Sequence, residues 1–318
     1  MNFQKAMVIG TGMMGPGIAV SLALGGVEAT VVSRTQEGAA KGLGSCHTAL
    51  DILLANGLIS KEQEEAGRSL VHCSDQFDET VRSVDLVVES APENLPFKQD
   101  LFAHMDSIAK PEAVLASNTS ALSITAIAER CQRPERVLTT HFWNPPHLMP
   151  LVEIVMGAKT SPEVAESVKE LLRRCGKMPV MVKKDRPGQL GNRLQMALVR
   201  EAANIVQEGI ASVEDVDLAA KSGFGLRLPV YGILEHQDAV GLDMGLHIVD
   251  YVTPDLNNEP RAPELMRQLV EQGSVGAKAG KGFYDWNSRG VSIDDVKRRR
   301  DEFLLFVMQS KFAPRPQS

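Results

Sequence analysis

Short apolar runs alternate with helical stretches along the first half of the chain. Six runs rich in β-branched residues predict strands over residues 6–10, 29–33, 70–73, 86–90, 113–117 and 137–141. Because these runs are apolar at almost every position, they suit a parallel sheet that helices cover on both faces. Two further strands are expected at 151–156 and 179–182, on either side of a helix over 161–175. The pattern therefore predicts an α/β fold with a doubly wound, mostly parallel sheet.

The pattern of the second half predicts helices almost throughout. A polar segment, 183–188, ends in Pro187-Gly188 and is the best candidate for a domain boundary. We therefore divide the chain into a sheet domain, 1–185, and an all-α C-terminal domain, 186–318. Apolar helix faces, such as the one that Leu194 and Leu198 share, predict a homodimer formed through the second domain. Its helices are expected over 191–207, 213–222, 230–251, 262–272 and 293–309.

The connection after the second predicted strand is unusually long. Residues 36–67 show helical periodicity twice, around 49–56 and 61–67. We expect a helical insertion here, a pair of helices that projects from the sheet.

A glycine-rich turn follows the first predicted strand directly and leads into a helix. In a dinucleotide-binding βαβ unit the first glycine permits the tight turn, and the second lets backbone N–H groups approach a pyrophosphate. The third lets the helix pack closely on the strand. We therefore predict a Rossmann-type domain over 1–185. The cofactor-binding residues that this turn predicts are Gly10, Gly12, Met13, Met14 and Gly15.

The end of the second predicted strand bears on the choice of cofactor. An acidic residue usually holds the adenosine ribose 2′-hydroxyl there, but this chain has Ser33-Arg34-Thr35. The two hydroxyls and the guanidinium would attract a 2′-phosphate, which an aspartate would repel. The triplet therefore favours NADP over NAD, unless Arg34 is only a solvated surface charge.

A histidine and a carboxylate are expected to meet at the carboxyl end of the sheet. His141 ends one predicted strand, and Glu153 lies between valine and isoleucine on the next. A buried carboxylate is costly without a partner, and the pairing would prepare His141 to take a proton from a substrate alcohol. Ser120 and Asn192 are candidate donors to the oxygen that becomes the carbonyl. The alternative is that His141 is a structural histidine satisfied by Glu153, with neither residue catalytic.

Charge and composition exclude several classes of partner. A net charge of −6 over 318 residues argues against nucleic-acid binding, and no apolar run is long enough to cross a bilayer. Four scattered cysteines predict neither a disulfide framework nor a metal site. The first residues lead straight into a predicted strand, so we expect no cleavable signal and a cytoplasmic location.

Taken together, the motifs resemble the 3-hydroxyacyl-CoA dehydrogenase family in order from residue 6 to about residue 286. The matching segments are the glycine turn, Val88-Glu89-Ser90-Ala91-Pro92-Glu93-Asn94 with Lys98, Ser117-Asn118-Thr119-Ser120, His141-Phe142-Trp143-Asn144-Pro145, Leu151-Val152-Glu153, Lys184-Asp185-Arg186-Pro187-Gly188, Asn192-Arg193 and Gly280-Lys281-Gly282-Phe283-Tyr284-Asp285.

The resemblance implies a dehydrogenase that interconverts a 3-hydroxyacyl-CoA, or a similar 3-hydroxy acid derivative, and its 3-oxo form. It implies a His141–Glu153 catalytic pair, with Ser120, Asn144 and Asn192 contacting substrate or orienting the histidine. Glu93 and Lys98 would lie near the nicotinamide end of the cofactor. The residues added to the cofactor site in this way are Ala91, Pro92, Glu93, Lys98, Asn118 and Asn144.

Some positions depart from the family pattern and keep alternatives open. The family has an acidic residue where Ser33 stands, and its helical pair commonly carries basic residues for the CoA phosphates. Here that pair has only Lys41 and Lys61, with Arg68 just after it. One alternative is a dehydrogenase of a free hydroxy acid or an aromatic alcohol, like the gulonate, carnitine and vitamin B6-breakdown relatives. Another is a non-catalytic nucleotide-binding protein of crystallin type.

Overall fold

The computed structural model describes residues 1–310, which form two units. The first unit runs from Met1 to Asn192 and contains the whole sheet, and the second begins at Arg193. The division thus falls a few residues after the boundary expected at 185. None of the helices of the described part is long and apolar enough to cross a membrane.

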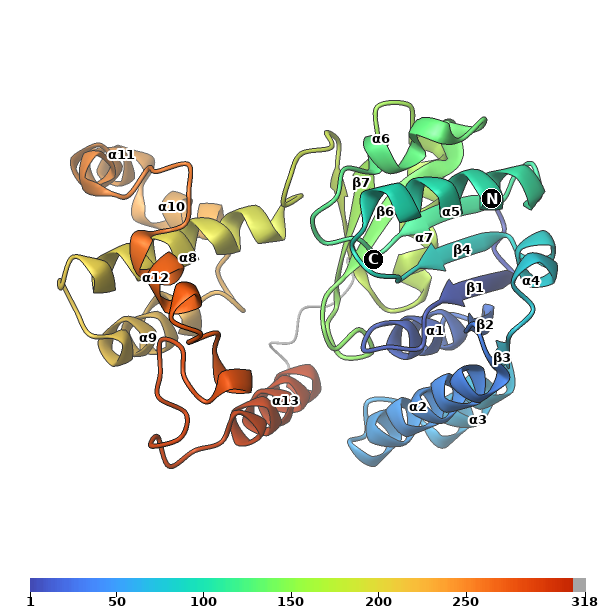
Figure 1. The fold of residues 1–318 in the computed structure, drawn as a ribbon, viewed down its shortest axis with the longest axis horizontal. Coiled ribbons are helices and arrows are strands. Elements are labelled where there is room, and N and C mark those ends of the chain that lie inside the picture. Colours follow the sequence, from blue (N-terminus) through green and yellow to red (C-terminus); the bar gives the residue numbers. More distant parts are fainter. Residues whose placement is uncertain (311–318) are drawn as a thin grey trace. The chain divides into compact units, whose positions relative to one another are not determined.

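One eight-stranded sheet, with strand order β3-β2-β1-β4-β5-β6-β7-β8, organises the first unit (Figure 1). All neighbours pair in parallel except β6 and β7, which are antiparallel. The predicted mostly parallel sheet is confirmed, and each strand lies within two residues of its expected bounds. The strands are β1 (Lys5–Ile9), β2 (Glu28–Val32), β3 (Val71–Ser74), β4 (Leu86–Glu89), β5 (Val114–Ser117), β6 (Val137–Phe142), β7 (Leu151–Met156) and β8 (Met178–Val182).

Helices cover both faces of the sheet. Successive side chains of a strand point to opposite faces, so apolar strands place apolar side chains on both faces, and helices bury them. Met7 of β1 packs into a core with α4 (Phe77–Ser83), α5 (Leu95–Ile108) and α6 (Ile124–Ile127). Its neighbour Val8 faces the other way, toward Gly15 at the start of α1 (Gly15–Leu24). Beside α1 lies α7 (Pro162–Arg174), since Cys175 after α7 touches Gly25 after α1. The sheet is therefore doubly wound.

The expected pair of helices is present after β2. The pair consists of α2 (Gln36–Ala55) and α3 (Lys61–Leu70), and both pack against α1. Helix α2 buries Cys46, Leu50 and Leu53, and Gly67 of α3 fits against Leu50. The apolar faces of α2 and α3 must be buried, and they are buried against α1.

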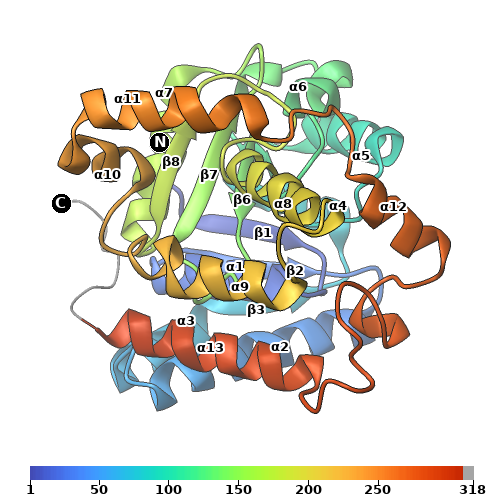
Figure 2. The ribbon, with the colours of Figure 1, turned by 90° about the vertical axis from the view of Figure 1, so that its left-hand side faces the viewer.

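Helices make up the second unit (Figure 2). The helix expected over 230–251 is wrong as a single element, because Gly241 has a φ of 102° and ends one helix before the next begins. Short 3-10 turns occur at Ala128–Arg130 and Pro134–Arg136 in the first unit and at Phe224–Leu226, Thr253–Asp255 and Ala277–Ala279 in the second. The α-helices are α8 (Gly191–Gln207), which starts in the first unit, α9 (Val213–Ser222), α10 (Ile233–Val240), α11 (Leu242–Val252), α12 (Glu264–Glu271) and α13 (Ile293–Gln309).

The second unit has almost no core of its own. Among its described residues only Ala203, Gly245 and Pro263 are buried. Large apolar side chains are exposed instead, and on α11 alone Leu246, Ile248 and Val249 are each more than half exposed. The apolar faces of this unit are therefore largely exposed in the single chain.

Candidate active site

The glycine turn after β1 has the geometry that a dinucleotide needs. Gly10 has a φ of 104°, and a Cβ there would lie 2.6 Å from the Ser90 carbonyl oxygen. A Cβ on Gly15 would lie 1.8 Å from the Gly10 carbonyl oxygen, so only glycine lets α1 approach the turn. A Cβ on Gly12, in contrast, would meet no atom within 4 Å. The first and third glycines fit tight packing, while the second borders open space.

The N-terminus of α1 is available to an anion. Met14 at the cap makes no side-chain hydrogen bond to the helix, and the first turn holds no acidic residue. Pro16 in the first turn removes one N–H and leaves the other amides to an external acceptor. Met13 beside them is 78 % exposed. These groups fit the pyrophosphate of a dinucleotide, because free amides and the helix dipole both favour negative charge.

The three residues after β2 have different environments. The Thr35 hydroxyl caps α2 by accepting a hydrogen bond from the Gly38 amide at 3.1 Å, so part of its hydrogen-bonding capacity is used. The Ser33 hydroxyl lies against Gly38 as well. Arg34 is exposed and forms no ion pair with any residue from 1 to 310. Its guanidinium is therefore the available charge of the triplet.

His141 and Glu153 face each other across β6 and β7. The antiparallel register sets the two residues directly opposite, and His141 Nδ1 lies 2.7 Å from Glu153 Oε2. Both side chains are buried. A carboxylate at this distance accepts a hydrogen bond from the Nδ1–H group and fixes that tautomer. Within the described chain Nε2 has no hydrogen-bond partner, so its lone pair remains available to a ligand.

Four donors surround the Glu153 carboxylate. Oε2 also accepts a hydrogen bond from Trp143 Nε1 at 3.0 Å, and Oε1 accepts from the backbone amides of Leu190 and Gly191 at 2.9 and 2.8 Å. Burial by itself would raise the pKa of Glu153, but these hydrogen bonds, the one with His141 foremost, outweigh burial and lower the pKa. Glu153 therefore stays charged at neutral pH.

Trp143 and Gly191 were given no role from the sequence. The Trp143 ring packs so closely on Gly191 that a Cβ there would lie 2.4 Å from it. One signal was present for the tryptophan, since a buried indole N–H needs an acceptor and Glu153 was the available carboxylate. No sequence pattern indicated that Gly191 would lie under the ring.

The structure brings Ser120 and Asn192 together. Asn192 Nδ2 donates to the Ser120 carbonyl oxygen at 3.1 Å, and the Ser120 amide donates to Glu93 Oε1 at 2.7 Å. Neither residue hydrogen-bonds to His141 within residues 1–310. The Ser120 hydroxyl has no described partner and remains available as a donor.

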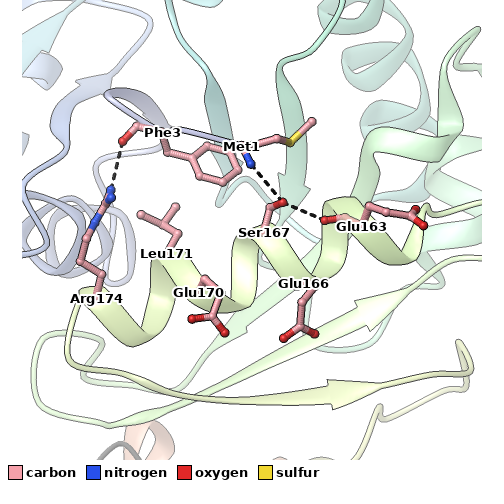
Figure 3. A pocket seen from close by; sticks show the side chains of 8 residues that line it. All are labelled: Met1, Phe3, Glu163, Glu166, Ser167, Glu170, Leu171 and Arg174. Atoms are coloured by element: carbon pink, nitrogen blue, oxygen red, sulfur yellow. Dashed lines mark hydrogen bonds between the residues drawn. The ribbon is translucent and has the colours of Figure 1, made fainter. Parts of the chain in front are cut away.

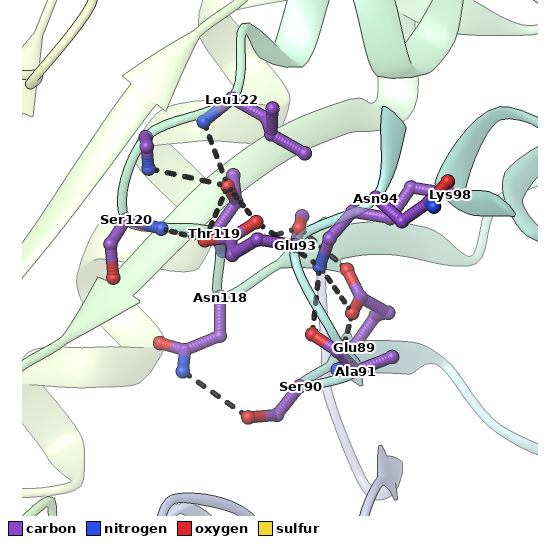
Figure 4. Close-up of polar contacts among 12 residues, drawn as sticks. Glu89, Ser90, Ala91, Glu93, Asn94, Lys98, Asn118, Thr119, Ser120 and Leu122 are labelled. Carbon is purple, nitrogen blue, oxygen red and sulfur yellow. Dashed lines mark hydrogen bonds and ion pairs between the residues drawn. The ribbon is translucent and has the colours of Figure 1, made fainter. Parts of the chain in front are cut away.

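A buried ion pair holds the loop that follows β4 (Figure 4). Lys98 is 1 % exposed, and its ammonium donates to Glu89 Oε1 at 2.6 Å and to the Ala91 carbonyl oxygen at 3.2 Å. Glu89 also accepts from the Ser117 hydroxyl and the Ala91 amide. Lys98 is thus inside the protein rather than open to a ligand. Glu89 was missed, although a carboxylate on a buried strand requires a cation or hydrogen-bond donors as partners.

Four further predicted cofactor residues lie at the same edge of the sheet. Asn118 is buried, and it links neighbouring strands by accepting from the Phe142 amide at 2.8 Å and contacting the Ser90 hydroxyl at 3.4 Å. Pro92 is exposed in the loop after β4, and Asn144 is exposed after β6. Glu93 accepts from the Thr119 hydroxyl at 2.8 Å, which ties the loop after β4 to the loop after β5.

Lys177 fixes the loop that follows His141. Its buried ammonium donates to the carbonyl oxygens of Pro146 and Met149, at 2.5 and 3.1 Å. Burial lowers the pKa of Lys177 to about 8. The sequence analysis gave this lysine no role, because its partners are backbone atoms rather than a side chain.

A separate hollow of about 570 Å³ opens between the N-terminal residues and α7 (Figure 3). The terminal amine of Met1 contacts the Ser167 hydroxyl at 3.4 Å, and Arg174 donates to the Phe3 carbonyl oxygen. None of the predicted site residues lines this hollow. Across residues 1–310, no three His, Cys, Asp or Glu side chains gather as metal ligands do.

Comparison with known proteins decides the family. The model of the 3-hydroxyacyl-CoA dehydrogenase NAD-binding domain matches residues 5–186, and that of the C-terminal domain matches residues 188–286. The chain belongs to the 3-hydroxyacyl-CoA dehydrogenase family. The resemblance drawn from the motifs is thereby confirmed, and so is the expectation of a dehydrogenase that uses a nicotinamide cofactor.

Relatives in this family differ in what they are named for. A 5-formyl-3-hydroxy-2-methylpyridine 4-carboxylate 5-dehydrogenase of Mesorhizobium japonicum is 32 % identical over 93 % of this chain and 95 % of its own length. A probable 3-hydroxybutyryl-CoA dehydrogenase of Deinococcus radiodurans is 38 % identical over 89 % of this chain and all of its own. A crystal structure of the former kind of enzyme, described as an NAD+-dependent dismutase, superposes with a TM-score of 0.88 at 30 % identity, covering 96 % of this chain and 97 % of that one.

Replacing Lys98 by methionine should strongly destabilise the first unit. The variant leaves Glu89 charged and buried without its cation, which costs about 3–5 kcal/mol. Adding Glu89→Gln removes that charge and should recover part of the loss. Lys5→Met is the matched control, because its ion pair with Glu28 is half exposed and is worth less than about 1 kcal/mol. Urea and thermal unfolding measure the differences. A Lys98→Met variant as stable as the parent would contradict the assigned ion pair.

Proposed function

We propose that this dehydrogenase interconverts a 3-hydroxy compound and its 3-oxo form, with His141 as the group that takes and returns the proton. The observation that carries the proposal is the 2.7 Å contact between His141 Nδ1 and Glu153, which leaves Nε2 without a described partner. A general base requires an unprotonated nitrogen that faces the substrate and a fixed orientation, and this contact supplies the orientation.

Each residue of the pair has a distinct task. Glu153 stays ionised, holds the proton on Nδ1 and stabilises the imidazolium that forms when Nε2 takes the hydroxyl proton. In the reductive direction the imidazolium returns that proton to the new alkoxide oxygen. The Ser120 hydroxyl and the second N–H of Asn192 are proposed as donors to the same oxygen. A bound nicotinamide supplies the hydride acceptor or donor at the reacting carbon.

The cofactor would be held at the edge of the sheet described above. We propose that Gly10, Gly12, Met13, Met14 and Gly15 hold the pyrophosphate. The exposed residues Pro92 and Asn144, together with Ala91, Glu93 and Asn118, would line the nicotinamide end. Lys98 would act there indirectly, because its ammonium fixes the carbonyl of Ala91 and does not reach the surface.

Substitution of His141 by glutamine tests the mechanism. The variant should lower kcat by about 100-fold to 10,000-fold, because the proton acceptor is lost. The Kd for reduced nicotinamide, measured by fluorescence titration, should not change. Turnover is measured with both reduced nicotinamides on a panel of 3-oxo CoA thioesters, free 3-oxo acids and aromatic aldehydes. A variant with the parent's kcat would exclude the mechanism. Tight cofactor binding without turnover of any compound would favour a non-catalytic, crystallin-type protein.

The same panel decides the substrate class. A CoA thioester is the first candidate, given the family. A free hydroxy acid or aromatic alcohol is the second, and the ion pairs of α2 and α3 favour it. Glu64 pairs with both Lys61 and Arg68, and Arg68 pairs with Asp51 as well. These cations are therefore occupied, which leaves Lys41 as the unpaired lysine of the helical pair. Strong preference for the free acids would exclude the thioester.

We further propose that the cofactor is NADP rather than NAD, on the basis of the unpaired guanidinium of Arg34. Arg34→Ala should weaken NADPH binding by about 5-fold to 150-fold, the loss of a charge-assisted hydrogen bond worth about 1–3 kcal/mol. NADH binding should change little, because NADH carries no 2′-phosphate. Arg130→Ala, which removes another exposed arginine of the first unit, is the control. Fluorescence titration measures each Kd, and equal effects on the two cofactors would refute the phosphate contact.

We also propose that the second unit pairs two copies of the chain. Its nearly complete lack of buried residues supports a permanent apolar interface. Sedimentation velocity should show a single species of twice the chain mass of 34.6 kDa. A folded monomer at micromolar concentration would contradict the proposal. The cytoplasm is the proposed location, since all four cysteines are free thiols.

A further inference from the structure

Gln189 occupies an unfavourable backbone conformation between β8 and α8. Its φ is 53°, and no other non-glycine residue of the described chain has a positive φ. Left-handed backbone is unfavourable for residues that carry a Cβ. The residue before it, Gly188, already has a φ of 78°, so two successive residues turn the chain here. Glycine would adopt this conformation at position 189 without strain.

The Gln189 side chain is unfavourably placed as well. It is 5 % exposed, and Nε2 donates to the Thr119 carbonyl oxygen at 2.7 Å. Its Oε1 is buried without any hydrogen-bond partner. A buried unpaired acceptor costs free energy, and so does the backbone strain. Gln189 carries both costs, and its side chain makes only one hydrogen bond, so stability does not explain its presence. The hydrogen bond to the Thr119 carbonyl oxygen is the contact that can explain it.

The bond belongs to a set formed by four consecutive residues, 189–192, which we call the clasp. The amides of Leu190 and Gly191 donate to Glu153 Oε1. The Asn192 side chain donates to the Ser120 carbonyl oxygen, next to the Thr119 carbonyl that Gln189 holds. The clasp therefore joins two otherwise separate segments. One is Glu153 on β7, and the other is the loop after β5.

The clasp fixes the distance between two parts of the proposed site. Glu153 orients His141, while the loop after β5 carries the Ser120 hydroxyl. Glu93 holds this loop from the side of the loop after β4, and from the clasp Asn192 alone would hold it at only one carbonyl. With Gln189 holding the neighbouring carbonyl, the loop is held at two successive points. Two anchors restrict orientation as well as position.

We propose that Gln189 is a positioning residue, which sets the Ser120 loop relative to the His141–Glu153 pair. It acts through Thr119 and touches no reacting atom. This inference rests on the proposed function, because it gives Ser120 a task in the reaction. This role explains why residue 189 carries a side-chain amide, although glycine would fit the backbone conformation better.

Two variants separate the amide from the backbone. Gln189→Met keeps the length and the strained φ but removes the N–H donor. Gln189→Gly removes the donor and the strain together. Both should lower kcat by about 10-fold to 100-fold, as misplacement of a positioning group does. The Kd for reduced nicotinamide and the pH midpoint of kcat should stay at the parent's values, because Glu153 keeps its contacts with His141. Gln132→Met is the matched control, because it makes the same change at an exposed glutamine of the first unit whose side chain makes no hydrogen bond within residues 1–310.

Amide hydrogen exchange provides a readout independent of activity. The peptide spanning residues 118–122 should exchange faster in both Gln189 variants than in the parent or in Gln132→Met. Parent-like kcat in both variants would overturn the proposal, and so would a loss of kcat without faster exchange in this peptide. If the parent enzyme turned over no compound of the panel, the proposed function would fail instead. The exchange measurement would still decide whether Gln189 holds the loop.

Discussion

The buried carboxylate of Glu153 is the interaction on which the rest of the site depends. A charge on an interior strand is tolerated only when hydrogen bonds replace the water that it has lost. Four donors do so here, namely a histidine, a tryptophan and two backbone amides at the start of α8. One charge therefore orients the imidazole and fixes the first turn of the helix that leads into the second unit. An apolar side chain at position 153 could neither orient the imidazole nor accept the hydrogen bonds of these amides.

The proposed cofactor side of the site depends on a second buried charge. Glu89 and Lys98 pair beneath the loop after β4, and their remaining hydrogen bonds hold Ala91 from both its amide and its carbonyl. This loop begins where the Gly10 turn touches Ser90, at the point where the strand order reverses between β1 and β4. Open α/β sheets bind ligands at such a point. Sheet topology brings the two loops together, and the ion pair makes one of them rigid.

Local patterns sufficed to predict much of this arrangement. The strands were predictable because each is apolar at nearly every position, and the glycine turn because steric limits act within a few residues. The histidine and the carboxylate were also predictable as a pair, since a buried acid needs a partner. Features that depend on distant partners were not. The packing of α2 on α1, the burial of Lys98 and the ring of Trp143 on Gly191 follow from the tertiary structure alone. The break at Gly241 was missed because apolar periodicity continues across it.

The tautomer of His141 tests the central claim most directly. Nitrogen NMR of the enzyme labelled at histidine distinguishes a protonated from an unprotonated ring nitrogen, and comparison with a His141→Gln sample assigns the signal among the seven histidines. In the free enzyme at mildly alkaline pH we expect the proton on Nδ1, held by Glu153, and an unprotonated Nε2. A proton on Nε2, or signals averaged between the two tautomers, would contradict the account.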